Sequence, residues 1–144
     1  MKWKLSQSVA ENAQTRLPKL AEKYFLAGRK AAEQGEQSPK HMHRFRLETK
    51  RFRYSLELFR PVYGPSMDQH LQRLKDLQNV LGELSDSRSM LDLFEGDKSL
   101  EAKLQRSIKR KWKEFRQQWD RFDTDGQLDS WRNYLKHGAG RVRR

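Results

Sequence analysis

Residues that interrupt helices occur at only a few places in this chain. The sequence holds eight Gly and four Pro, and the stretches between them repeat apolar residues every three or four positions, the spacing of an amphipathic helix. No stretch alternates apolar and polar residues as a half-buried strand would. The sequence therefore predicts an all-α fold, and its short connections predict an antiparallel four-helix bundle with long helices.

The helix boundaries follow from the same residues. Pro18 should kink the first helix or start a new one, since proline lacks the amide proton that the preceding turn needs. Ser38 and Pro39 are typical of a helix start, and Pro61 should end that helix at the residue before it. The predicted main helices are residues 5–34, 39–60, 66–84 and 98–122.

Shorter elements complete the prediction. Ser85 and Asp86 have the character of an N-cap, so we expect a separate short helix that ends near Phe94. The segment DTDGQ is typical of a turn, and LDSWRNYLK can add one more short helix after it. Residues 138–144, GAGRVRR, should form a disordered basic tail. Residues 1–137 are thus expected to form a single domain.

The charge of the chain limits its partners. Lys and Arg number 31 against 19 Asp and Glu, which gives a formal net charge of +12. Such an excess repels itself in a compact fold, so a polyanion is the expected ligand: nucleic acid, an anionic membrane surface or an inorganic polyanion. The absence of Cys excludes disulfides and thiol chemistry. With no apolar run near the ~20 residues of a membrane span and no signal-peptide core, we expect a cytoplasmic protein.

The most informative segment is HRFRLETKRFRY, residues 43–54. On a helix, His43, Arg46, Lys50 and Arg53 form one narrow basic stripe, because they are three or four residues apart. Apolar residues lie on both sides of this stripe, so we expect the helix to pack on both sides and to hold its cations in a confined groove. The two apolar stripes are Phe45, Phe52, Leu56 and Phe59 on one side, and Leu47, Tyr54 and Leu58 on the other.

The remaining side of this helix is mixed in charge. Arg44 and Arg51 share it with Glu48 and Ser55, as expected for an ordinary solvent-exposed face. The basic stripe, by contrast, has no acid until Glu57. Separating like charges in this way costs repulsion unless an anion occupies the stripe.

Other predicted helices carry basic residues that could line the same channel. They are also regularly spaced along one side of their helices. Arg and Lys both bind phosphate oxygens, and His43 can donate a hydrogen bond to one. The additional candidates are Arg16, Lys19, Lys23, Lys75, Arg106, Lys109, Arg110 and Lys113.

Two motifs resemble the CHAD family, the conserved histidine α-helical domain. One is His43-x-x-Arg46 followed by Lys50-Arg51-x-Arg53-Tyr54 and the segment SLELF; the other is LKDLQNVLGELSD, residues 74–86. The resemblance covers about residues 43–94. It implies a helical module that binds inorganic polyphosphate, associates with polyphosphate granules or phosphate-handling enzymes, and contacts the anion through His43, Arg46, Lys50 and Arg53. No cofactor is implied.

The chain departs from the family in one respect. A usual CHAD domain holds two related four-helix halves, each with its own HxxR helix, whereas this chain has the motif once. The resemblance therefore implies a single half of a CHAD domain. A homodimer would restore the missing half by two-fold symmetry.

Three other functions compete with polyphosphate binding. Some CHAD relatives are fused to triphosphate-cleaving metal enzymes, but those need repeated Glu-x-Glu spacing on strands, which is absent here, so we expect neither catalysis nor a metal site. Nucleic-acid binding fits the same charge, although Phe45, Phe52, Phe115 and Trp119 are better explained as core than as stacking platforms. Trp3 and Trp131 remain free to stack. A scaffold that recruits a protein partner to polyphosphate is the third alternative.

Overall fold

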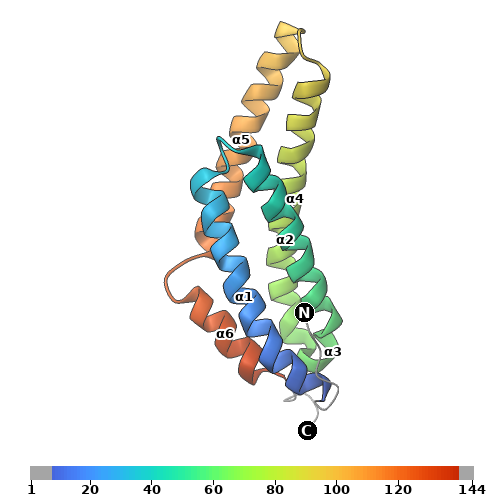
Figure 1. Cartoon of the computed structure of the whole chain (residues 1–144), viewed down its shortest axis with the longest axis vertical. Coiled ribbons are helices and arrows are strands. Elements are labelled where there is room, and N and C mark those ends of the chain that lie inside the picture. The colour runs from blue at the N-terminus through green and yellow to red at the C-terminus, as the bar shows by residue number, and fades with distance from the viewer. Residues whose placement is uncertain (1–7, 140–144) are drawn as a thin grey trace.

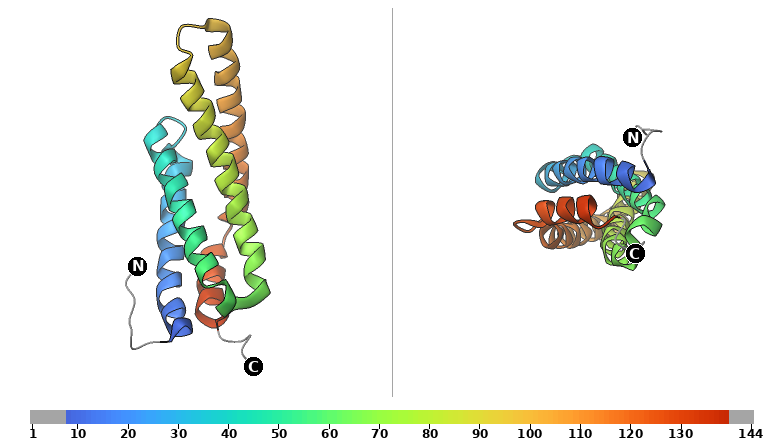
Figure 2. Two further views of the ribbon diagram at one scale, coloured as in Figure 1. Left: turned by 90° about the vertical axis from the view of Figure 1, so that its right-hand side faces the viewer. Right: turned by 90° about the horizontal axis from the view of Figure 1, so that it is seen from below.

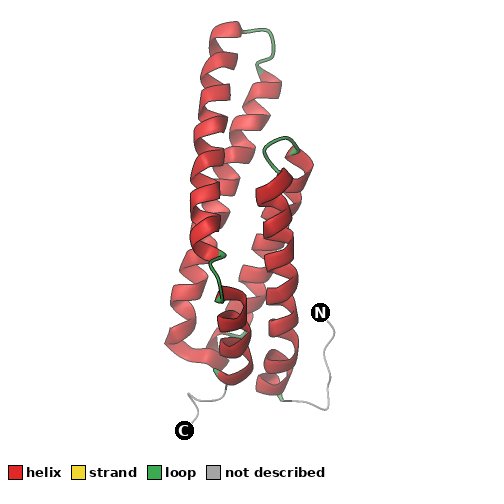
Figure 3. Cartoon of the chain, turned by 90° about the vertical axis from the view of Figure 1, so that its left-hand side faces the viewer, coloured by secondary structure: helices red, strands yellow, loops and turns green. Residues whose placement is uncertain are grey.

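The computed structural model describes residues 8–139, and within that range it contains helices and connections but no strand. The prediction of an all-α fold is confirmed (Figures 1 and 3). The elements are α1 (Val9–Gln34), α2 (Pro39–Leu58), α3 (Arg60–Tyr63), the 3₁₀ turn η1 (Gly64–Ser66), α4 (Met67–Leu93), α5 (Lys98–Phe122) and α6 (Gln127–His137).

The long helices form two antiparallel pairs, α1 with α2 and α4 with α5, and α2 packs against α4. The α4–α5 hairpin extends beyond the loop that joins α1 to α2 (Figures 1 and 2). Helix α6 runs on in the direction of α5 and packs along α1. The arrangement thus differs from a plain four-helix bundle, because α5 and α6 share the fourth position.

Local sequence signals set the helix starts. The side chain of Ser8 accepts a hydrogen bond from the amide of Glu11, and the Glu11 carboxylate accepts one from the amide of Ser8, a capping box that opens α1. Asp97 caps α5 through the amide of Leu100. Pro18 lies inside α1, which continues through it, so a new helix start at Pro18 is wrong. Helix α2 begins at Pro39 as predicted.

The predicted boundary near residue 84 is wrong. Helix α4 continues from Met67 to Leu93, and the expected separate helix from Ser85 to Phe94 is part of it. Gly82 costs roughly 1 kcal/mol in a helix interior, but Leu81 and Leu84 on either side are buried, and burying each contributes more than that. The N-cap signal of Ser85 and Asp86 is local, and the packing of α4 overrides it.

The chain around Pro61 also differs from a plain loop. Helix α2 ends at Leu58, before Pro61, as predicted. The chain then forms the single turn α3, with Pro61 in the first turn, where a missing amide proton costs nothing. This turn and η1 reverse the chain direction and lead into α4.

Aromatic side chains dominate the core. Tyr24 of α1 stacks between Phe45 and Phe52 of α2, with ring centroids 5.1 and 4.8 Å away. Trp119 of α5 meets Phe45 edge-on at 5.4 Å. Trp131 of α6 is also buried, 1% exposed. Apart from Trp3, which lies outside the described residues, the aromatic residues considered for stacking on a ligand are therefore core residues.

Residues 138 and 139 belong to the folded domain. Gly138 caps α6, and Ala139 is buried, with its carbonyl oxygen accepting a hydrogen bond from Gln14 at 3.3 Å. The ordered domain therefore includes two residues that we assigned to the tail. Residues 140–144, the rest of that predicted tail, lie outside the described residues.

Candidate functional site

The basic stripe of α2 faces α4. A Cβ atom built on Gly82 of α4 would lie 3.9 Å from Nε of Arg46. His43, one turn away on α2, lines a cavity together with Ser85, Arg88 and other residues of α4. The core-facing side of α2 adjoins this stripe and holds Met42, Phe45, Thr49, Phe52 and Leu56, all buried.

The antiparallel packing of α2 and α4 fixes which residues oppose each other. Both helices rise by 1.5 Å per residue, and Arg46 lies opposite Gly82. A residue a given number of positions after Arg46 on α2 therefore lies opposite the residue the same number of positions before Gly82 on α4. The basic stripe then faces small, amide or basic side chains, and one acid, Asp92, lines the cavity at its His43 end. We call this the α2–α4 groove: His43, Arg46, Lys50 and Arg53 of α2, opposite Ser85, Gly82, Gln78 and Lys75 of α4.

The cations in the α2–α4 groove are poorly satisfied. Among residues 8–139, no ion pair joins His43, Arg46 or Lys50 to an acid. Arg46 is half-buried, and its Nε has no hydrogen-bond partner. A partly desolvated guanidinium without an acceptor is costly. An anion in the groove would remove that cost.

Arg53 differs from Arg46 in having charged and aromatic neighbours. Its Nε also lacks a hydrogen-bond partner, but it lies 3.3 Å from a carboxylate oxygen of Glu57, and its guanidinium lies over the ring of Tyr54 at 5.1 Å. The Arg53 side chain is only 16% exposed. These contacts hold the guanidinium in one place at the end of the groove, which lowers the entropy lost when it binds an anion.

The mixed face of α2 behaves as an ordinary surface. Arg51 is 75% exposed and pairs with Glu48 at 3.3 Å. Arg44 is exposed as well. An exposed pair of this kind contributes little to stability, and neither arginine faces α4.

The expectation that α2 packs on both sides of its basic stripe is wrong. Leu47, Tyr54 and Leu58 are 41%, 52% and 63% exposed. Both neighbours of α2, helices α1 and α4, lie toward the core, so nothing within the described chain covers this outer apolar stripe. The groove therefore has a wall on α4 and an open apolar edge on the other side.

The basic residues of α1 do not join the α2–α4 groove. Helix α1 packs chiefly against α2 and α6. Lys19 and Lys23 are exposed on its outer side, near Glu22, and Arg16 is half-buried. This surface is mixed in charge, unlike the groove.

The basic residues of α5 lie on yet another face. The core side of α5 carries Phe115 and Trp119, whose rings lie 6.0 and 5.4 Å from Phe45 of α2. Arg106, Lys109, Arg110 and Lys113 are all exposed, and their spacing places them on the opposite side of α5. Of the candidates outside α2, only Lys75 belongs to the groove.

The end of α4 also belongs to the site, although the predicted helix ends before it. Arg88 lines the cavity beside His43 and donates hydrogen bonds to the carbonyl oxygens of Gly35 and Glu36, at 3.4 and 3.3 Å. Burial lowers the pKa of the Arg88 guanidinium, and the Glu36 carboxylate opposes that effect. The signal was present in the leucine spacing, which continues past Gly82 to Leu84 and Leu91.

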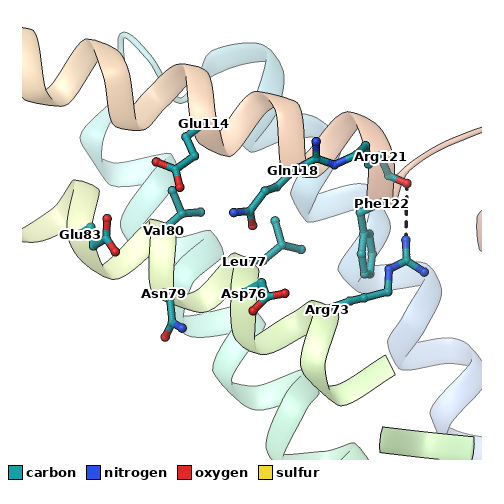
Figure 4. Close-up of a pocket in the computed structure, with 10 residues that line it drawn as sticks. All are labelled: Arg73, Asp76, Leu77, Asn79, Val80, Glu83, Glu114, Gln118, Arg121 and Phe122. Carbon is teal, nitrogen blue, oxygen red and sulfur yellow. Dashed lines mark hydrogen bonds between the residues drawn. The ribbon is translucent and has the colours of Figure 1, made fainter. Parts of the chain in front are cut away.

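A second cavity lies on the other side of α4, against α5 (Figure 4). Arg73 and Arg121 lie at one end and Glu83 and Glu114 at the other. Arg73 lies over the ring of Phe122 at 5.0 Å and donates a hydrogen bond to the carbonyl oxygen of Arg121 at 3.4 Å. The mixed charge of this cavity makes it a poor site for a polyanion.

Two further observations bear on function. Among the described residues, no group of three or more His, Asp or Glu side chains is placed to hold a metal ion. In the same range, every helix is too short or too polar to cross a membrane.

The fold and the groove define a class: a helical protein with a row of basic side chains between two antiparallel helices. A family model for the CHAD domain matches residues 2–95. The chain belongs to the CHAD domain family, which is associated with polyphosphate binding. The match covers α1 to α4 and includes both walls of the α2–α4 groove. Searches of curated proteins and of solved structures found no match.

Proposed function

We propose that this protein binds inorganic polyphosphate along the α2–α4 groove. The observation that carries the proposal is the row of His43, Arg46, Lys50 and Arg53 facing α4, where a single acid, Asp92, lines the cavity at the His43 end. The row spans roughly 15 Å along the helix axis. It therefore suits several consecutive phosphates of a chain better than a single small anion.

Arg, Lys and His each make a different kind of contact with phosphate. Arg46 and Arg53 can each donate two parallel hydrogen bonds to phosphate oxygens. Lys50 adds a compact charge that tolerates a range of oxygen positions, and His43 can donate from its ring. Lys75 extends the row from the α4 side. Binding by many such contacts should weaken steeply with salt, because each contact releases a condensed counterion.

We assign the protein a binding role without catalysis. This assignment rests on the character of the groove, which is built mainly from hydrogen-bond donors, with Asp92 as the single carboxylate that lines the cavity beside His43. A cytoplasmic site of action at polyphosphate granules belongs to the same proposal. The family association supports it.

We also propose that two copies associate through α2. The outer apolar stripe of Leu47, Tyr54 and Leu58 is exposed along the open edge of the groove. Burying it in a homodimer would remove apolar surface from water and place two basic rows side by side. A symmetric pair is the arrangement that a single CHAD half implies.

Competition at matched charge tests the choice of ligand. A labelled long-chain polyphosphate bound to the full chain would be displaced with unlabelled polyphosphate, RNA, DNA and short phosphates across a salt series. Polyphosphate should compete more strongly per charge than either nucleic acid at every salt concentration, because its phosphates follow one another without intervening sugars and can match the closely spaced cations of the row. Equal competition by RNA would show binding by charge alone and would contradict specific polyphosphate recognition.

A further inference from the structure

The outer face of α5 is a second, separate basic surface. Arg106, Lys109, Arg110 and Lys113 are all exposed, at spacings that place them on one side of the helix. Lys103 lies at its edge, one turn before Arg106. We call this set the α5 face.

Neighbouring acids do not neutralise the α5 face. Within the described residues, no ion pair involves any of its members. Each of the four central residues has two of the others three or four positions away, so their like charges repel along the helix. The side of α5 toward α4 is different, because Lys111 there pairs with Glu83 of α4.

The outer side of α1 shows what an ordinary charged surface of this protein looks like. Lys19, Lys23 and Lys30 are exposed there, but Glu22 and Glu33 follow Lys19 and Lys30 at a spacing of three. Both signs are therefore interspersed on α1. On the α5 face no acid lies between Arg106 and Lys113, and the nearest one at such a spacing is Glu114, four residues after Arg110.

The α5 face and the α2–α4 groove cannot act as one channel. Phe115 and Trp119 of α5 point toward Phe45 of α2 through the core, so the α5 face points away from α2. Helix α4 packs against both α2 and α5 (Figures 1 and 2). A single extended segment of polyanion cannot contact both surfaces without bending around α4.

From this separation we infer that the α5 face is a second polyphosphate-binding surface, so that one protein molecule bridges two polyphosphate segments. The inference rests on the proposed function of the α2–α4 groove. Two contact surfaces on opposite sides let each protein cross-link chains, and many proteins on long chains then form a network. Polyphosphate would be condensed as well as bound.

The test compares two variants that lose equal charge. The α5 variant removes three charges from the α5 face by the substitutions Lys109→Gln, Arg110→Gln and Lys113→Gln. The α1 variant removes three charges from the mixed outer side of α1 by Lys19→Gln, Lys23→Gln and Lys30→Gln. Each is measured for affinity toward a short labelled polyphosphate and for turbidity with long-chain polyphosphate. Circular dichroism checks that both remain helical.

The α5 variant should keep its affinity for the short chain within about threefold but lose turbidity by about tenfold or more. The α1 variant should keep both. Equal loss of turbidity in the two variants would overturn the inference, since net charge alone would then condense the chains. Undiminished turbidity in the α5 variant would also overturn it, because a homodimer with two grooves would then be the bridge. Failure of the wild-type protein to bind short polyphosphate would instead contradict the proposed function itself.

Discussion

Arg46 of α2 lies directly across the groove from Gly82 of α4, whose missing Cβ would be 3.9 Å from Nε of Arg46. Any longer side chain at residue 82 would extend into the space around this guanidinium. Gly82 thus costs helix stability and leaves the Arg46 guanidinium accessible to an anion. The leucine-rich motif LKDLQNVLGELSD contains this glycine and supplies the wall of the groove.

Substitutions of Gly82 should separate stability from binding. Gly82→Ala should stabilise the protein by about 0.5–1 kcal/mol and leave polyphosphate affinity unchanged, because its Cβ makes an ordinary contact. Gly82→Met should weaken binding about tenfold, the equivalent of one lost charge-assisted contact. Urea denaturation and polyphosphate titration measure the two effects. Unchanged affinity in the methionine variant would mean that the anion does not reach Arg46.

The buried hydroxyl pair of Tyr24 and Thr49 should fix which side of α2 faces α1 and the core. Tyr24 lies 2.9 Å from Oγ1 of Thr49, which donates in turn to the carbonyl oxygen of Phe45 at 2.8 Å. Burial raises the pKa of the Tyr24 phenol, so Tyr24 is protonated and donates to Thr49. Thr49→Val should cost about 1–3 kcal/mol, because it leaves that buried donor without a partner.

The double variant Thr49→Val, Tyr24→Phe gives the control. Removing the orphaned hydroxyl should recover about 1 kcal/mol relative to Thr49→Val alone. Urea denaturation at neutral pH measures all three variants. A double variant less stable than Thr49→Val would show that the hydroxyl pair does not stabilise α2.

Acid should destabilise the protein through His70. Its ring lies 4.4 Å from that of Trp131 and 4.5 Å from that of Tyr134. Burial, with a smaller effect of the Arg73 charge, lowers the pKa of His70 to about 4. In the unfolded chain His70 binds a proton near pH 6.5, whereas in the folded protein it stays neutral until about pH 4. The contribution of His70 to the free energy of unfolding is therefore constant above pH 6.5 and falls as the pH drops toward 4.

The loss from His70 should be on the order of 1–2 kcal/mol, less than the full value of the shift because the ring keeps some contact with water. His70→Phe keeps the aromatic packing and removes the titration. The difference in unfolding free energy between wild type and His70→Phe should therefore change between pH 6.5 and pH 4. Parallel curves for the two proteins would refute the assignment.

Association through the outer apolar stripe is tested by the molecular mass in solution. Light scattering at micromolar concentration should give a dimer for the wild type, and Leu47→Glu with Leu58→Glu should give a monomer, since two buried carboxylates would repel. Both leucines are exposed in one chain, so the substitutions should leave its fold intact. A wild-type mass of 17.3 kDa would rule out the dimer.

The sequence predicts α2 and its basic stripe well, because periodicity within one helix fixes the direction of each side chain relative to the helix's own core face. It does not reveal which neighbour lies on each side. For this reason the basic residues of α1 and α5 could be expected in one channel with α2, although the structure places them on separate faces. Periodicity likewise could not show that the outer apolar stripe lacks a neighbour.

The end of α4 illustrates a second limit. Ser85 and Asp86 are good N-cap residues, and Gly82 is a poor helix residue, so local preference favours a break. The burial of Leu81 and Leu84 against the rest of the bundle decides otherwise. Because of that error, Ser85 and Arg88 were not recognised as neighbours of His43.

The most direct test of the groove compares two triple variants of α2. The groove variant removes three groove cations by the substitutions Arg46→Gln, Lys50→Gln and Arg53→Gln. The control removes three exposed charges from other sides of the same helix by Lys40→Gln, Arg44→Gln and Arg51→Gln. The measurement is the affinity for long-chain polyphosphate as a function of salt. The groove variant should lose affinity by about a hundredfold, and its slope of log affinity against log salt should flatten by about 2. The affinity of the control should change by less than about threefold. Equal losses in the two variants would show that net charge alone binds polyphosphate and would contradict the groove.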